Sequence, residues 1–370
     1  MNAPTPPPTG ARRLASTVFH QPYVWAVVAL ALLLVINLIK DPGYLAVSVN
    51  PTTGNLAGNV IDILRAGAPI MMIAIGMTLV IATRGIDLSV GSVMAVSGAV
   101  SMEFMSNAGD GTAGTAFLAA LAALAISALL GAVNGLLVSV VGLQPFITTL
   151  ITMLAGRGLA KVITAGQNTS ASNEPFRWIA NGTVFGFPVV FVIGAVIVIV
   201  VAVLIRRTAL GLMIESIGVN PKAARMAGIR PIGILISVYI VSGVLAGIAG
   251  IFSTASVMTV EVAKTGQSAE MDAILAVVIG GTSLAGGKFS LTGSVIGALL
   301  IATLDKTIVF LSIPSSATPA FKALVIVIIC LLQSRRVRAL FNQRRARSGR
   351  RPTPTDPATP APAQKVTVSA

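Results

Sequence analysis

The sequence predicts an all-α membrane protein, a polytopic bundle of about ten transmembrane helices, and three observations lead to this fold class. Hydrophobic residues make up 55% of the 370 residues and charged residues 10%, and the mean hydropathy is +0.89. A soluble domain carries about 25% charged residues, so this chain lacks the polar groups that would cover a water-exposed surface. Long apolar runs recur along the chain, and Lys and Arg gather in short loops between them.

Ten segments approach the length of about 20 apolar residues that a transmembrane helix requires. In chain order they are 23–39, 66–83, 88–105, 117–141, 145–164, 187–205, 232–257, 271–285, 291–311 and 318–332. Small residues recur inside them, including the pairs Gly131/Gly135 and Gly243/Gly247. Such pairs let helix backbones approach closely in lipid, so we expect tight helix packing at both.

Basic residues set the expected orientation. Arg12 and Arg13 precede the first segment, and Arg335, Arg336 and Arg338 follow the last. Because cytoplasmic loops are enriched in Lys and Arg, both termini are expected in the cytoplasm, which requires an even number of spans. The chain is therefore predicted to be a multi-pass membrane protein with lipid as its surroundings.

The same patterns divide the chain into three parts. Residues 1–20 and 335–370 are rich in proline or basic residues and are expected to be disordered cytoplasmic tails. Residues 21–334 form the predicted membrane domain. The tail 335–370 contributes +8 of the net charge of +14. Because this charge directly follows an apolar run, it indicates a membrane anchor and not a nucleic-acid-binding site.

Residue usage excludes much catalytic chemistry. His20 is the only histidine and Cys330 the only cysteine, which removes disulfides, clustered metal sites and histidine-dependent catalytic triads. We therefore expect no metal, no cofactor and no catalytic residue in this chain. The segment 282–289 superficially resembles a phosphate-binding loop, but Thr282 replaces the required glycine and Phe289 the required Ser or Thr. ATP is therefore not expected to bind at this segment.

The loop 206–231, after the sixth segment, is the most informative stretch. Asn220 is a suitable N-cap, and Pro221 suits the first helical position. Lys222–Ala227 then form a predicted short helix with a basic face, and Gly228 can end it. Such a helix is either an ordinary amphipathic surface helix or a docking element for a cytoplasmic partner.

Five motifs give the chain a family resemblance. They are Gly211…Glu215-x-x-Gly218-x-Asn220-Pro221-x-Ala223-Ala224-x-x-x-Gly228-Ile229, the stretch 76–92, the stretch 276–287, the stretch 144–150, and Asn134-Gly135. Together they resemble the membrane permeases of monosaccharide ABC importers over residues 55–334, and most closely the galactofuranose-importer permease. Arg84 departs from this pattern, because the family commonly has glycine at that position.

The resemblance implies a vitamin B12-importer-like (type II) ABC permease fold in the bacterial inner (plasma) membrane. It also implies a dimer with a second copy or a paralogue, a cytoplasmic ABC ATPase subunit and a periplasmic sugar-binding protein. The cargo would be a monosaccharide, galactofuranose-like or a pentose. The residues that the resemblance assigns to ATPase coupling are Glu215, Gly218, Asn220, Pro221, Ala223, Ala224, Arg225 and Gly228.

A sugar path requires neutral hydrogen-bonding groups, because a desolvated polyol needs replacement hydrogen bonds. The in-span candidates of this kind are Asn134, Thr148, Thr149, Ser242 and Thr303, with Asp305 as a charged candidate.

Other in-span charges favour structural roles. Asp305 and Lys306 are adjacent and need partners elsewhere, because neighbouring residues on a helix do not face each other. Arg84 and Asp87 are expected to pair locally, and Arg157 is expected to extend outward with Lys161.

Two other functions stay open. A stand-alone secondary transporter would need in-membrane carboxylates for ion coupling, and Asp305 and Glu103 are the best candidates. A membrane-embedded enzyme is the weaker alternative, because the sequence has no histidine pair and no cysteine nucleophile with a nearby histidine.

Overall fold

Each of the ten predicted segments contains a helix in the computed structural model, which describes residues 23–49, 56–314 and 316–333. These helices are α2 (Val24–Lys40), α3 (Asn59–Ala82), α4 (Val90–Ala108), α5 (Ala113–Leu136), α6 (Pro145–Ile163), α8 (Val189–Arg207), α11 (Pro231–Val257), α12 (Ala269–Ile279), α13 (Leu291–Phe310) and α14 (Thr318–Gln333). The predicted tails 1–20 and 335–370, and the arginines that set the orientation, lie outside the described residues.

Short elements connect these helices. They are the helices α7 (Glu174–Asn181), α9 (Leu210–Val219) and α10 (Pro221–Met226), and a π-helical turn η1 (Leu137–Val141) that extends α5. Three antiparallel two-stranded pairs join β1 (Ser48–Val49) to β2 (Leu56–Ala57), β3 (Thr169–Ser170) to β6 (Thr259–Val260), and β4 (Thr183–Val184) to β5 (Phe187–Pro188).

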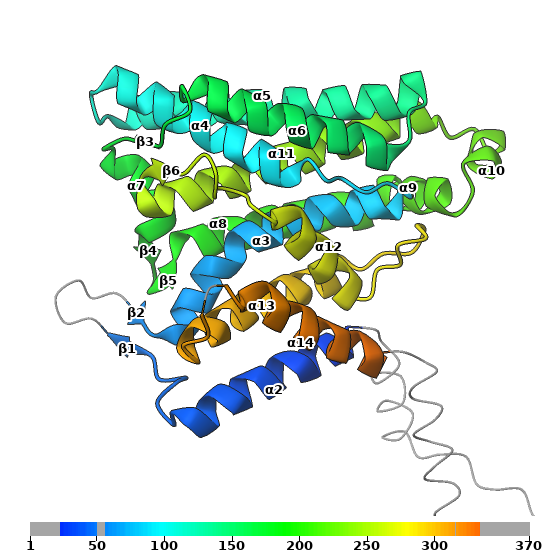
Figure 1. Ribbon diagram of the computed structural model, residues 1–370. Helices are drawn as coiled ribbons and strands as arrows, with labels where there is room; N and C mark the ends of the chain where they lie inside the picture. Colours follow the sequence, from blue (N-terminus) through cyan, green and yellow to red (C-terminus); the bar gives the residue numbers. More distant parts are fainter. Residues whose placement is uncertain (1–22, 50–55, 315, 334–370) are drawn as a thin grey trace, which may run out of the picture.

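The helices lie side by side in one bundle (Figure 1). The helices α9 and α10 lie at one end, which we call the α10 end. The opposite end, which we call the α7 end, carries α7 and the short strand pairs. Six helices in the described part of the chain are long and apolar enough to cross a membrane: α3, α5 with η1, α6, α8, α11 and α13.

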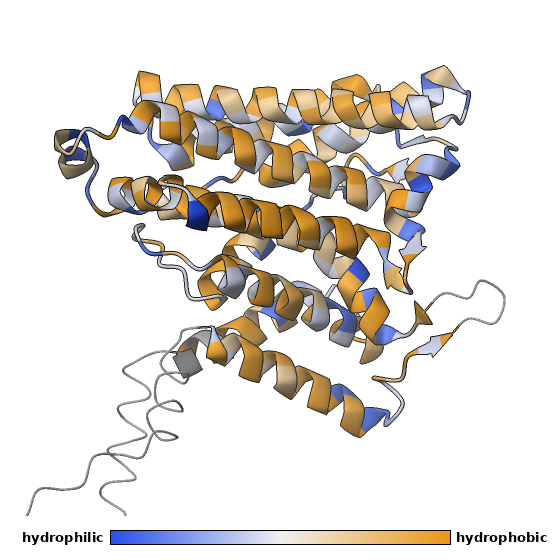
Figure 2. Cartoon of the chain, turned by 180° about the vertical axis from the view of Figure 1, so that it is seen from behind, coloured by the Kyte–Doolittle hydropathy of each residue, from blue (hydrophilic) through white to orange (hydrophobic). Residues whose placement is uncertain are grey.

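The central helix of the bundle is α3. Its most apolar stretch is 72% buried, whereas that of α8 is 22% buried. It packs against α8, α11, α12 and α13, which explains why it is apolar on every side. By contrast, α5 and α8 expose large apolar side chains such as Phe117 and Ile199, and apolar residues cover the outer faces of the bundle (Figure 2). An apolar exterior of this extent suits a bilayer and not water.

Helices α5 and α11 cross at the predicted small residues. A Cβ atom on Gly131 would overlap the Tyr239 carbonyl oxygen, and one on Gly243 would lie 2.5 Å from the Ser127 carbonyl oxygen. The expectation of tight packing at these glycines is therefore confirmed, and it fixes the position of Ser242 within the core.

Candidate functional site

Three of the sequence motifs meet at the α10 end. The Gly287 amide donates to the Ala82 carbonyl at 2.9 Å, which joins the 280–290 loop to the last residue of α3. A Cβ atom on Gly218 of α9 would overlap both the Ala82 oxygen and the Gly287 nitrogen. We call this meeting of Ala82, Arg84, Gly218 and Gly287 the coupling junction. Its segments are in direct backbone contact, so one cannot shift without displacing the others.

Arg84 ties the same segments together, and the prediction that it pairs with Asp87 is wrong. Its Nε donates to the Ala285 carbonyl at 3.1 Å, and its Nη2 donates to the Val219 carbonyl at 2.6 Å. The planar guanidinium can reach two carbonyls at once, which a local pair with Asp87 would prevent. The backbone of Arg84 has a φ of 66°, in the left-handed region that favours glycine. This conformation accounts for the expected glycine at that position.

The short helix α10 confirms the local prediction to within one residue at each end. Asn220 Oδ1 accepts hydrogen bonds from the Lys222 and Ala223 amides at 3.0 and 3.1 Å, and Pro221 occupies the first turn. At the other end Gly228 has a φ of 85°.

The end of α10 has the hydrogen bonds of a Schellman motif. The Ile229 amide donates to the Ala224 carbonyl and the Gly228 amide donates to the Arg225 carbonyl, each at 3.0 Å. Both ends of α10 are therefore capped, which stabilises a helix too short to persist alone.

The surface of α10 is open. Lys222, Ala223 and Arg225 are exposed and Met226 is 85% exposed, whereas Ala224 is buried. The helix thus presents two cations and an apolar tip away from the bundle. Such a surface suits a protein partner with acidic and apolar groups.

Glu215 faces a different environment from the other predicted coupling residues. With Arg206, Gly211 and Phe289 it lines a cavity of about 480 Å³ between α8, α9 and the start of α13. The structure therefore separates the predicted coupling set into an exposed helix, a packed glycine and a cavity-lining carboxylate.

A buried polar network lies at the start of α4. Asp87 accepts hydrogen bonds from the Ser89 amide and hydroxyl at 3.0 and 2.6 Å and from the Ser242 hydroxyl at 2.8 Å. Asn134 donates to the Ser89 hydroxyl at 2.9 Å and accepts from the Thr152 hydroxyl at 2.6 Å. All five side chains are buried, so their polar groups are satisfied by one another.

The predicted path residues fall into two groups. Asn134 and Ser242 meet in this network, and Thr149 is next to it, because its hydroxyl donates to the Ile86 carbonyl at 3.0 Å. The Thr148 hydroxyl is buried without a partner among the described residues. The sequence did not single out Ser89 or Thr152, although Ser89 lies within a recognised motif.

Thr303 and Asp305 form the second group, away from the network on α13. Thr303 bonds the Leu299 carbonyl of its own helix at 2.7 Å. Asp305 pairs with Lys322 of α14 at 2.7 Å, and Lys322 also reaches Asp272 of α12 at 3.2 Å. The expectation that Asp305 and Lys306 need partners elsewhere is confirmed.

Arg157 contradicts its prediction. Instead of extending outward, its guanidinium donates to the Thr265 and Gly266 carbonyls, each at 2.6 Å. These carbonyls lie in the loop before α12, and their hydrogen bonds stabilise the half-buried cation there. Lys161 is exposed as expected.

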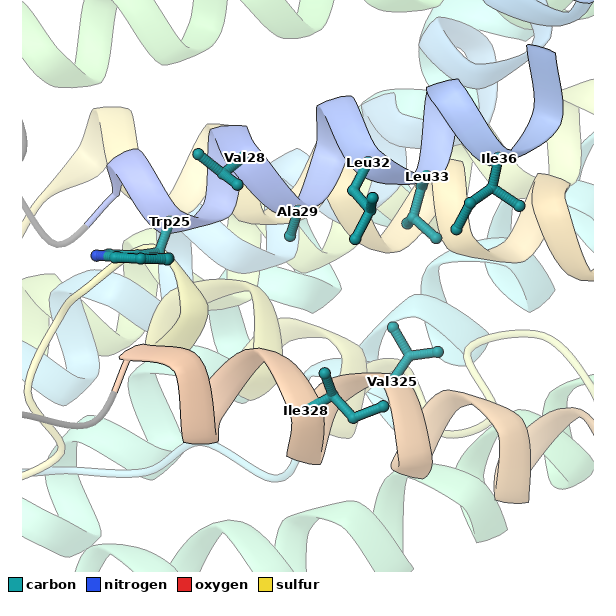
Figure 3. A pocket seen from close by; sticks show the side chains of 8 residues that line it. All are labelled: Trp25, Val28, Ala29, Leu32, Leu33, Ile36, Val325 and Ile328. Atoms are coloured by element: carbon teal, nitrogen blue, oxygen red, sulfur yellow. The ribbon is translucent and has the colours of Figure 1, made fainter. Parts of the chain in front are cut away.

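An apolar groove between α2 and α14 is seen in Figure 3, with side chains of both helices directed into it. Its volume is about 180 Å³, and it is lined by Trp25, Val28, Ala29, Leu32, Leu33, Ile36, Val325 and Ile328. This lining suits an acyl chain and offers a sugar almost nothing to hydrogen-bond.

A bundle of long apolar helices with a short, capped and exposed helix at one end is typical of a membrane transport protein of the permease class. The chain belongs to the family described as the branched-chain amino acid transport system / permease component, which matches residues 59–332.

Three similar proteins are permeases for sugars. The fructose import permease of Bifidobacterium longum is 56% identical over 88% of this chain and 91% of its own length. The galactofuranose transporter permease of Escherichia coli K12 is 41% identical over 86% and 92%. The ribose import permease of the same strain is 36% identical over 84% and 93%. No solved structure matches the chain.

The resemblance to sugar ABC importer permeases is therefore confirmed. These relatives are transport subunits and not enzymes. Of the three, the fructose permease is more similar to this chain than the galactofuranose permease.

Proposed function

We propose that this chain is the permease subunit of an ATP-driven ABC importer, which passes a monosaccharide across the inner membrane. A periplasmic binding protein delivers the sugar, and a separate ATPase subunit hydrolyses ATP. The chain itself contributes no cofactor site. The coupling junction carries the proposal, because the exposed α10 is joined through α9 and Gly218 to the end of the central helix α3.

The topology of the proposal follows from the sequence and the helices. The six long helices together with α2, α4, α12 and α14 make ten crossings, in a type II arrangement with both termini in the cytoplasm. The α10 end then faces the cytoplasm and the α7 end faces the periplasm. Exposed apolar faces on α5 and α8 are suited to lipid and to a second permease copy or paralogue.

The cargo is proposed to be a monosaccharide in its five-membered ring form. The relatives' names give fructose, galactofuranose and ribose, and each of these sugars can adopt a furanose ring. Fructose comes first among them because its permease is the most similar of the three. This choice extends the sequence-based expectation of a furanose or pentose to a ketohexose.

The proposal is tested by replacing Lys222–Ala227 with a flexible linker of equal length. Membrane vesicles containing the ATPase, the binding protein and the variant should insert the permease normally but lose ATP-driven uptake of D-fructose. Affinity purification should also lose the co-purifying ATPase. The control replaces residues 106–111, the exposed last residues of α4 and the turn that follows them at the α7 end. Uptake that survives in the linker variant would refute the coupling role.

A secondary transporter remains the second candidate, motivated by the in-span carboxylate Asp305. Its ion pair with Lys322 weakens that case, because a paired carboxylate is less available for binding a transported cation. Uptake that survives ATP depletion but collapses with the proton gradient would favour this candidate.

A further inference from the structure

A half-open cavity of about 450 Å³, lined by both polar and apolar side chains, lies at the α7 end of the bundle. It is enclosed by α3, α7, α8, α11 and α13, with apolar walls that include Pro69 and Phe252. Asp62 and Arg65 of α3, Ser253 and Ser256 of α11, and Lys306 of α13 provide its polar groups. Its size falls within the range of about 300–1,000 Å³ that is usual for small-molecule sites. None of the predicted path residues lines it.

The charged groups of this cavity are only partly paired. Lys306 Nζ lies 3.0 Å from Asp62 Oδ2, and both side chains remain partly exposed. Arg65 lies three residues after Asp62 on α3, which puts the two on the same face of the helix. The Nε of Arg65 is buried and has no hydrogen-bond partner in the described part of the chain. A buried donor without an acceptor is unfavourable. Because Arg65 also lines the cavity, a rotamer change that turns its guanidinium towards a bound ligand would give this donor an oxygen.

The backbone of α3 adds an acceptor at the same place. Pro69 has no amide hydrogen, so it cannot donate to the carbonyl of Arg65 four residues earlier. Both residues line the cavity. The cavity wall thus combines an unpaired donor on a side chain with a carbonyl that lacks its usual helical donor.

This combination matches the chemistry of a monosaccharide. A sugar presents hydroxyl groups that both donate and accept hydrogen bonds, and a less polar C–H face. Asp62 can accept from a hydroxyl, Arg65 can donate to one, and the apolar walls can pack against the ring. By contrast, the polar groups of the Asp87 network are occupied by one another, and the α2–α14 groove is apolar.

We propose that this cavity is the site where the permease first binds its monosaccharide, with Arg65 and Asp62 as the hydroxyl-binding residues. The inference rests on the proposed function, because it takes the cargo to be a sugar and the α7 end to be its entrance. The α3–α13 ion pair between Asp62 and Lys306 then lies at the edge of the bound ring and positions the carboxylate.

The first experiment measures ATP-driven uptake of D-fructose by vesicles that contain the complete importer. Arg65→Gln removes the charge and should raise the half-saturating sugar concentration about tenfold, the loss expected for one charge-assisted hydrogen bond. Arg65→Lys should recover part of this loss, and Lys161→Gln, an exposed cation elsewhere, should change nothing. Basal ATP hydrolysis should stay at the wild-type rate in Lys161→Gln.

A second experiment does not depend on the folding of an arginine variant. In a Cys330→Ser background, Ser256→Cys places a thiol at the exposed edge of the cavity, and Ser237→Cys places one at the other end of the same helix. D-Fructose should slow maleimide labelling at position 256 and leave position 237 unchanged. D-Ribose and a non-sugar polyol such as glycerol test whether the site recognises the ring.

The two experiments distinguish a failure of the proposed function from a failure of the cavity assignment. If the wild-type importer takes up no monosaccharide, the proposed function fails. If it transports sugar but Arg65→Gln keeps the wild-type half-saturation and sugar does not protect position 256, only the assignment of this cavity is overturned.

Discussion

The two ends of this permease are built by different means. At the α10 end, contacts are between backbones: Gly218 lies against Ala82 and Gly287 with no room for a methyl group. At the α7 end, the short strand pairs are joined through their backbones, but side chains make further contacts between separate segments, such as the Lys306–Asp62 pair and the bond from Thr169 to Glu103. When two backbones are in direct contact, a displacement of one segment displaces the other. Side chains can instead change rotamer and exchange partners. The first arrangement suits the transmission of motion and the second suits binding of a ligand.

The largest expected effect tests the packing at the α10 end. Gly218→Ala forces a methyl group into occupied space, which typically costs about 1–3 kcal/mol of unfolding free energy. We expect a lower Tm in detergent and loss of most ATP-driven uptake. Gly233→Ala is the matched control, because its Cβ would meet nothing within 4 Å. A wild-type Tm and uptake rate in Gly218→Ala would show that the coupling junction can accommodate a methyl group at this position.

The second-largest expected effect concerns the ion pairs that Lys322 makes with Asp272 and Asp305. Lys322→Met leaves Asp272 and Asp305 facing each other without their shared cation. Because these groups are mostly buried, we expect a loss of about 1–3 kcal/mol, below the range for fully buried pairs. Thermal unfolding in detergent measures it. Lys264→Met breaks an exposed pair with Glu261 and should hardly change Tm, and equal losses in the two variants would contradict the assigned burial.

A smaller effect is expected at the N-cap of α10, where a substitution should reduce sugar uptake without lowering the thermal stability of the bundle. Asn220→Ala removes the N-cap of α10, which costs about 1 kcal/mol of local helix stability. Because α10 is exposed, the Tm of the bundle should hold while uptake falls several-fold. Asn220→Ser keeps a capping oxygen and should retain most uptake. A fall in Tm that matches the fall in uptake would mean that α10 supports the fold and not only the docking.

The smallest effect concerns the start of α5 at the α7 end. Asp110 accepts hydrogen bonds from the Thr115 hydroxyl at 2.8 Å and from the Thr112 amide at 3.2 Å. These bonds, that from Thr115 foremost, lower the pKa of this exposed carboxyl. Because the pKa of Asp110 is lower in the folded state than in the unfolded state, its ionised carboxylate stabilises the fold at any pH above the unfolded pKa of about 3.9. This stabilisation is lost as the pH falls through the lower pKa of the folded state. The Tm difference between wild type and Asp110→Asn should therefore shrink on acidification, and a constant difference would contradict it.

Local sequence predicted what local interactions determine. Asn220, Pro221 and Gly228 fixed the ends of α10, because capping involves residues within a few positions of each other. Hydropathy likewise located ten helices. The number that cross the membrane and the type II arrangement stay predictions.

Local sequence patterns could not predict hydrogen bonds between residues that are far apart in the chain. Arg84 bonds residues 135 and 201 positions away, and Arg157 bonds carbonyls 108 and 109 positions away. The α7-end cavity also escaped notice, since five separate helices form it. The sequence did not single out Asp62 and Arg65, although two charged residues spaced three apart at the start of an apolar helix could have indicated a polar site there.

The central helix α3 belongs to both ends. Its first turns carry Asp62 and Arg65 beside the cavity, and its last residue, Ala82, lies in the coupling junction. Its 24 residues form a rod of about 36 Å at 1.5 Å per residue. Tilting such a rod by about 5° around one end moves the other end by about 3 Å, roughly the length of a hydrogen bond. If α10 docks the ATPase as proposed, a push on α10 would tilt α3 and move Asp62 and Arg65 at the proposed sugar site.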